Sequence, residues 1–165
     1  MSRREKREKR ARFAESSERY EQLASRQLEV SVAKIEIRNE ILFKAPTRVG
    51  LLADVTEALN AAGVNILAIG AYDKGDMGEF LMITNNNKLA YEALSHLGGE
   101  MDMQSVIVAE VPNKQGELAA IARKLADHGV NVEQVYATSV DGTDTVMVVM
   151  TASCEIDAVE LLENL

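Results

Sequence analysis

A repeat with a period of 66 residues is the feature of this sequence that most restricts its fold. Shifting the chain by 66 positions superimposes prolines, glycines and apolar residues without a gap. The matching positions are Pro46 with Pro112, Gly50 with Gly116, Leu52 with Leu118, Ala53 with Ala119, Leu59 with Leu125, Gly63, Val64 and Asn65 with Gly129, Val130 and Asn131, and Ala71 with Ala137. Two copies predict two small domains, because a solenoid needs at least three repeats.

Each copy has the pattern strand, helix, strand, strand, helix. Apolar periodicity predicts these elements at 41–45, 51–62, 64–72, 79–85 and 89–97, and again at 106–111, 117–128, 130–139, 145–151 and 156–165. Asp141 and Gly142 between two β-rich runs are a hairpin signal. This order predicts an α+β fold of two ferredoxin-like (βαββαβ) domains, each an antiparallel sheet with its helices on one face.

A fourth strand is needed to complete each domain. Residues 100–104 can close the first copy, but nothing follows the last helix to close the second. The alternating residues 31–37 are therefore predicted to complete the second domain, with a truncated chain as the alternative. The predicted organisation is a charged helical tail at 1–30, the strand at 31–37, a first domain at 38–104 and a second domain at 105–165.

Several predicted strands are apolar at every position. Residues 80–83, 106–109 and 146–150 show no alternation, so both faces of each sheet need cover. Helices can cover only one face. The other face is expected to pack on a second sheet, either within the chain or in a homodimer.

Charge is unevenly distributed along the 165 residues. Residues 1–27 hold nine of the 18 basic and five of the 26 acidic residues, a net charge of +4, which leaves −12 for residues 28–165. So acidic a body makes nucleic acid an unlikely partner. The tail is predicted to be a solvated helix, with an arm that binds a partner protein or nucleic acid as the alternative.

Localisation and catalysis are constrained by what the sequence lacks. There is no apolar run near 18 residues and no apolar signal segment, so no membrane association is expected. A single cysteine, Cys154, is compatible with the cytoplasm. Two separated histidines and one cysteine offer no metal site, and no catalytic motif is present. The protein is therefore predicted not to be an enzyme and to need no cofactor.

The stretch from Val106 to Asn131 contains the most suggestive local feature. An apolar strand, a glycine-marked turn and an amphipathic helix follow one another, so the first turn of the helix faces the space above the end of the strand. Free backbone N–H groups and the helix dipole make such a place suitable for a carboxylate or phosphate.

These turns, with the two Gly-Val-Asn triplets, resemble the ACT domain family of βαββαβ ligand-sensing modules. The resemblance covers about residues 38–165 and is closest to stand-alone tandem ACT proteins. The residues that carry it are Pro112, Asn113, Lys114, Gln115, Gly116, Glu117 and Leu118 with Gly129, Val130, Asn131 and Val132, and in the first copy Pro46, Thr47, Arg48, Val49, Gly50, Leu51 and Leu52 with Gly63, Val64, Asn65 and Ile66.

The resemblance implies an effector site between two domains, built from the turn before the first helix and the residues that open the second strand. Position by position, the implied ligand-binding residues are Asn113, Gln115, Gly116, Glu117, Leu118, Asn131 and Val132 in the second copy, and Thr47, Val49, Gly50, Leu51, Leu52, Asn65 and Ile66 in the first. The asparagines Asn65 and Asn131 fit equally well as turn residues that bond their own backbone. The first copy departs from the family pattern at Thr47 and Val49, so its site is the less certain of the two.

Two functional hypotheses follow. The first is a cytoplasmic, non-catalytic regulatory protein that senses a small amino-acid-like effector at ACT domain interfaces and that is expected to be a homodimer. The second is a ligand-free dimeric interaction scaffold whose basic N-terminal tail binds a partner protein or nucleic acid.

Overall fold

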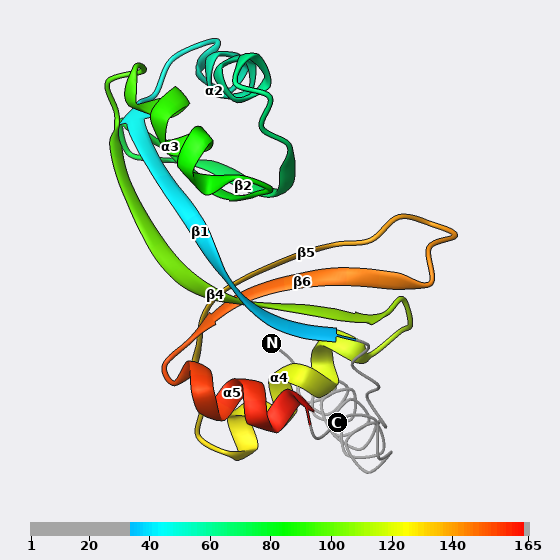
Figure 1. The fold of residues 1–165 in the computed structure, drawn as a ribbon. Coiled ribbons are helices and arrows are strands. Elements are labelled where there is room, and N and C mark those ends of the chain that lie inside the picture. The colour runs from blue at the N-terminus through cyan, green and yellow to red at the C-terminus, as the bar shows by residue number, and fades with distance from the viewer. Residues whose placement is uncertain (1–33, 164–165) are drawn as a thin grey trace, which may run out of the picture. The chain divides into compact units, whose positions relative to one another are not determined.

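A computed structural model describes residues 34–163. The predicted tail at 1–30 lies outside the described residues, as do residues 31–33. The elements, in chain order, are β1 (Lys34–Pro46), α2 (Leu51–Ala61), β2 (Ile66–Lys74), β3 (Met77–Thr84), α3 (Asn87–Ser95), β4 (Glu100–Pro112), α4 (Glu117–Asp127), β5 (Val132–Thr138), β6 (Thr145–Ala152) and α5 (Glu155–Glu163) (Figure 1). The predicted α+β fold is therefore present, with two repeats of strand, helix, strand, strand, helix.

One antiparallel sheet joins the two repeats. Its strand order is β2-β3-β1-β4-β6-β5, so the long strands β1 and β4 lie at the centre (Figure 1). β1 includes residues 34–37 of the predicted strand 31–37 together with the predicted strand 41–45, and β4 includes the predicted strands 100–104 and 106–111. These segments are extended as predicted, but the predicted break within each pair is wrong, because each pair forms one continuous strand. Neither Arg38–Glu40 nor Ser105 includes a glycine or proline that would interrupt an extended backbone.

The pairing of β1 with β4 shows that each of these two strands contributes to both repeats. Glu40–Lys44 pair with Glu100–Gln104, and Lys34–Arg38 pair with Val106–Glu110, the first strand of the second repeat. We therefore propose that the segment ending at residue 37 belongs to the second domain although it precedes the first in sequence.

Helices cover one face of the sheet in each repeat. In the first repeat, alternate residues of β1 and β3 pack with α2 and α3 in a buried core: Ile41, Phe43, Ala45, Leu51, Val55, Leu59, Val64, Phe80, Met82, Ala90 and Leu94. The corresponding alternation in β4 and β6, together with α4 and α5, buries Ile107, Ala109, Val111, Ile121, Leu125, Val148, Met150, Ala158 and Leu162. Burial of these side chains is the main stabilising contribution to each repeat.

The face without helices is partly covered within the same chain. Ile83 of the first repeat forms a buried cluster with Val106, Val108 and Val149 of the second. Ile83 lies on β3, and β1 and β4 separate that strand from β6 in the sheet. The sheet must therefore bend so that its two halves meet, which agrees with the expectation that this face packs on β-structure.

A buried carboxylate lies at the same junction. Glu40 of β1 has no solvent exposure and accepts hydrogen bonds from Tyr136 Oη at 2.6 Å, Gln104 Nε2 at 2.7 Å and Gln134 Nε2 at 3.3 Å. Tyr136 and Gln134 belong to β5, three strands away from β1 and about 14 Å distant in a flat sheet. Burial, together with the hydrogen bond to Glu40, raises the pKa of the Tyr136 hydroxyl above its ordinary value.

Candidate functional sites at the two turns

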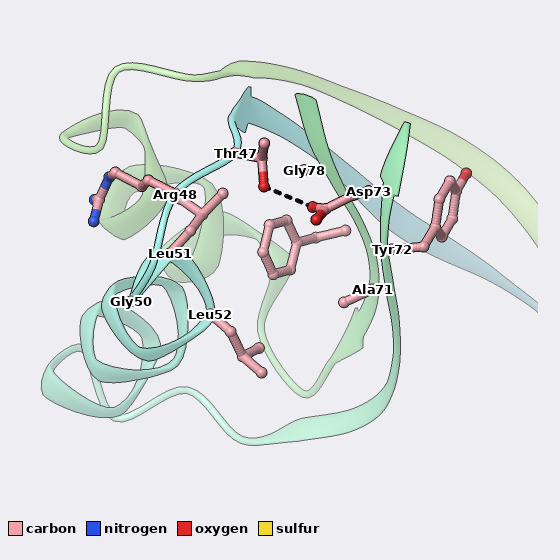
Figure 2. Close-up of a pocket in the computed structure, with 10 residues that line it drawn as sticks. Thr47, Arg48, Gly50, Leu51, Leu52, Ala71, Tyr72, Asp73 and Gly78 are labelled. Atoms are coloured by element: carbon pink, nitrogen blue, oxygen red, sulfur yellow. Dashed lines mark hydrogen bonds between the residues drawn. The ribbon is translucent and has the colours of Figure 1, made fainter. Parts of the chain in front are cut away.

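Each repeat has a pocket beside the turn that joins its first strand to its first helix. In the first repeat the pocket has a volume of about 320 Å³, and its lining residues come from that turn, from the end of β2 and from β3 (Figure 2). They are Thr47, Arg48, Gly50, Leu51, Leu52, Ala71, Tyr72, Asp73, Gly78 and Phe80. The volume corresponds to roughly ten water molecules at about 30 Å³ each, which suits a small metabolite.

Polar groups of the first pocket are largely paired with one another. Thr47 Oγ1 donates to Asp73 Oδ1 at 2.8 Å, the bond drawn in Figure 2. The Arg48 guanidinium forms an ion pair with Asp54, and Figure 2 shows its side chain directed away from Asp73. The cation of this pocket is therefore already paired, which leaves Asp73 as its other charged side chain.

Tight packing shapes the floor of this pocket. A Cβ atom on Gly78 would lie 2.8 Å from Leu51 Cδ2, so a larger residue here would require the end of the Leu51 side chain to move. At the rim, Tyr72 donates to Glu79 Oε2 at 2.8 Å, and this bond raises the pKa of Tyr72 and lowers the pKa of Glu79.

The second pocket has a volume of about 200 Å³ and occupies the equivalent place. It is lined by Val111, Pro112, Asn113, Lys114, Glu117, Leu118, Ala137, Thr138, Ser139, Val146 and Val148. The side-chain amide of Asn113 donates to the backbone oxygens of Val140 at 3.3 Å and Thr143 at 3.1 Å. Asn113 therefore fastens the turn to the hairpin loop, as Thr47 does in the first repeat through Asp73.

Glu117 differs from the other polar groups of this pocket. Its Oε2 atom is buried and is the one buried side-chain oxygen or nitrogen in residues 34–163 without a hydrogen-bond partner. At the same position the first repeat has Leu51, a core residue.

Both pockets adjoin helix starts that lack a side-chain cap. Gly50 and Gly116 are the N-cap residues of α2 and α4, with φ angles of 90° and 100°, and neither helix has a side-chain cap hydrogen bond. Helix α3 of the same chain is capped by Asn86, whose side chain accepts from Leu89 N. Left-handed backbone favours glycine, and glycine leaves the N–H groups of the first turn open to an anion.

The predicted site residues fall into two groups, those in the turns and those at the start of the second strand of each repeat. Thr47, Gly50, Leu51 and Leu52 line the first pocket, and Asn113, Glu117 and Leu118 line the second. Val49, Gln115 and Gly116 belong to the same turns but do not line the pockets, and Val49 is fully exposed. The remaining predicted residues are Asn65, Ile66, Asn131 and Val132.

This last group lies at the opposite end of the second strand of its repeat. The pockets contact residues 71–73 and 137–139, five to seven positions after Ile66 and Val132, or roughly 16–23 Å along the strand. Asn65 N donates to Asn85 Oδ1 at 2.9 Å, and Asn131 N donates to Ser153 Oγ at 3.0 Å. Within one repeat the asparagines and the turn are therefore not brought together, and a joint role stays a prediction.

Sequence reasoning missed the second wall of each pocket. Most lining positions recur exactly one period apart: 47 and 113, 48 and 114, 51 and 117, 52 and 118, 71 and 137, 72 and 138, 73 and 139, 80 and 146. Of the missed residues in these second walls, only Ala71 and Ala137 carry a signal, because they are identical under the 66-residue shift. Pro112, which lines the second pocket from the turn side, carries the same signal through its match with Pro46.

A further hollow of about 540 Å³ lies away from the turns, between α3 and the start of β4. Its lining residues are Asn39, Asn87, Lys88, Tyr91, Glu92, Met101, Asp102 and Met103. No group of three or more metal-ligating side chains occurs among residues 34–163. Over the same range, the helices are too short or too polar to span a bilayer.

A family comparison matches both repeats. The ACT domain model matches residues 39–98 and 105–165. A comparison with curated protein sequences finds no significant match.

Solved structures with the same fold include several regulatory subunits. A structure described as protein BT0572 from Bacteroides thetaiotaomicron is 24% identical, with a TM-score of 0.72 over 79% of this chain and 89% of that one. The regulatory subunit of aspartate kinase from Thermus thermophilus, in a ligand-free form, is 19% identical, with a TM-score of 0.62 over 81% and 97%. The aspartokinase alpha and beta subunits are 21% identical, with a TM-score of 0.59 over 81% and 97%. These similarities establish a shared fold.

Proposed function

Because this chain belongs to the ACT domain family, we propose that it is a non-catalytic regulatory protein that senses a small amino-acid-like effector. Both repeats are ACT domains, and the fold is shared with proteins described as regulatory subunits of aspartate kinase. The effector sites are the turn pockets, and the regulated partner acts in the cytoplasm.

One observation carries this proposal: the helices that border the pockets begin without a side-chain cap, whereas α3 is capped. The α-carboxylate of an amino acid can accept hydrogen bonds from the open N–H groups and gain from the helix dipole. A site that binds its ligand in only one conformation of the protein shifts the population toward that conformation, which is the physical basis of regulation.

The apolar surroundings of the pockets favour a homodimer. Leu52 and Leu118 are 53% and 46% exposed, and Ile69 and Val135, on the outermost strands β2 and β5, are 39% and 46% exposed. Each pair is separated by one period, so equivalent apolar patches adjoin both pockets. A second subunit that covered these patches would also enclose the effector, in keeping with an effector site between domains.

Calorimetry and thermal-shift measurements on the full chain with each of the twenty amino acids test the proposal. Ala71→Trp and Ala137→Trp each fill one pocket, and Ala126→Trp, on the exposed side of α4, is the matched control. We expect at least one amino acid to bind and raise the melting temperature, and one pocket variant to abolish the effect while the control retains it.

The outcome that contradicts the proposal is a uniform absence of binding, with all three variants behaving alike. Deleting residues 1–27 then distinguishes the interaction scaffold, because tail-dependent association with a partner would be lost on deletion. Light scattering of the full chain measures the dimer directly.

A further inference from the structure

The first-turn carboxylate of α4 lacks an explanation in the fold. Glu117 Oε2 is buried and unpartnered, although nearly all buried polar groups in folded proteins have a hydrogen-bond partner. A carboxylate near a helix start is favoured by the dipole, but an exposed side chain would gain the same benefit without burial. The equivalent Leu51 shows that this position packs well with an apolar residue.

A lysine at the mouth of the same pocket has also lost its partner. In the first repeat, Arg48 is paired with Asp54. One period later these residues are Lys114 and Ala120, so the acidic partner is gone. Lys114 makes no ion pair within residues 34–163, with Glu117 or with any other residue.

The second pocket therefore presents two opposite charges that are not neutralised by each other. A buried carboxylate oxygen needs a donor, and the ammonium group of a ligand supplies one. Lys114, with the uncapped start of α4, can meet a carboxylate. This arrangement is complementary to a zwitterion, whereas in the first pocket the cation, Arg48, is already paired with Asp54.

The remaining lining limits the size and polarity of the ligand. The volume of about 200 Å³ corresponds to roughly seven water-sized groups. Val111, Val146 and Val148 are apolar, Thr138 and Ser139 offer hydroxyl groups, and no further charged side chain lines the pocket. The α-amino acid backbone fills most of this space and leaves room for a side chain of about one to three non-hydrogen atoms.

We propose that Glu117 is the ammonium-recognising residue of the second pocket and that this pocket takes a small α-amino acid with an uncharged side chain. This inference rests on the proposed function. It adds that the two pockets are chemically different, with the second the selective one. The role of Glu117 in the second pocket is recognition of the ligand, and its buried Oε2 atom stays without a hydrogen-bond partner until the ligand binds.

The test compares fragments of one ligand on matched variants. L-alanine and L-serine are titrated against the full chain beside propionate, which lacks the ammonium, and ethylammonium, which lacks the carboxylate. Calorimetry gives the affinity, and amide chemical shifts of Thr138 and Ser139 locate the ligand. Glu117→Gln keeps the side-chain shape, Glu117→Leu supplies the residue of the first repeat, and Glu155→Gln in the first turn of α5 is the matched control.

We expect L-alanine or L-serine to bind the wild type at least tenfold more tightly than propionate or ethylammonium. Both Glu117 variants should lose that tenfold preference for the amino acid over propionate, while Glu155→Gln retains it. Without ligand, Glu117→Gln should melt at the same temperature as the wild type or higher, because Glu117 Oε2 makes no hydrogen bond that the substitution could break.

The following results distinguish a failure of this inference from a failure of the proposed function. Binding that survives Glu117→Gln, or that is lost only on Ala71→Trp, overturns this inference and leaves the proposed function standing. No binding of any amino acid to the wild type overturns both. A lower melting temperature of ligand-free Glu117→Gln with unchanged affinity shows that Glu117 serves only the helix start.

Discussion

Replacing Glu40 tests how the two repeats are held together. Its carboxylate accepts three hydrogen bonds in a site without solvent exposure, two of them from β5 of the other repeat. Glu40→Val removes the acceptor and leaves two amide groups and one hydroxyl without their partner. Leaving buried neutral donors without their acceptor costs about 1–3 kcal/mol. We expect a loss of that size in the free energy of unfolding.

Urea unfolding, followed by far-UV circular dichroism, measures this loss. Tyr136→Phe removes one donor, and the double variant Glu40→Val/Tyr136→Phe forms a thermodynamic cycle with the two single variants. Because the two groups contact each other, the double variant should lose less than the sum of the single losses by about 0.5–3 kcal/mol. Val108→Ala in the neighbouring apolar cluster is a control that disturbs the same junction without touching the network.

The reasoning is refuted if Glu40→Val unfolds within about 0.5 kcal/mol of the wild type, which is typical of surface changes. A gain in stability also refutes it. Such gains occur when apolar residues replace buried ion pairs and repack well. Val106, one period after Glu40, shows that the junction accepts valine on its other side.

Three further predictions concern titration, turns and the central strand. Because the pKa of Tyr136 is raised in the folded state, the folded state binds more protons than the unfolded state above about pH 10, and the free energy of unfolding falls as pH rises further. Tyr136→Phe should make that fall smaller, as measured by urea unfolding at a series of pH values. Gly116→Ala forces a side chain into left-handed backbone and should cost about 1–2 kcal/mol of unfolding free energy, whereas alanine at Gly70, whose φ is not positive, is the matched control. Ile35→Asp places a charge opposite Ala109 in the β1–β4 pair. It should reduce the amide-exchange protection of β4 and β6 more than that of β3. An equal loss of protection in both repeats would contradict the assignment of the segment ending at residue 37 to the second domain.

Much of the fold could be predicted because its determinants are local and occur twice. The Gly50 and Gly116 turns, the apolar periodicity of the helices and the hairpin signals each act within a few residues of chain. Their repetition after 66 residues turned weak signals into a consistent pattern. Ile35 and Ile37 could be assigned to a strand from alternation alone.

The junction and the pocket walls could not be predicted, because they depend on contacts between distant residues. Glu40 is 94 and 96 positions from its partners Gln134 and Tyr136. In a strand pattern an acidic residue is read as solvent-exposed, and only the bend of the sheet buries this one. Thr138 likewise lies on the strand β5, far from the turn in sequence, and carries no motif.

Divergence between the repeats gives the duplication its functional meaning. Had both copies kept identical pockets, the chain would present two equivalent sites. Instead, Asp54 of the first repeat corresponds to Ala120 of the second. Leu51 of the first repeat, which is apolar, corresponds to Glu117 of the second, which is acidic. In the first repeat these residues close the core and neutralise Arg48, which favours stability. In the second, the same positions leave a lysine and a carboxylate oxygen unpaired, which favours binding. The same fold therefore supports two turn pockets of different chemistry, one with its cation paired and one with its charges unpaired.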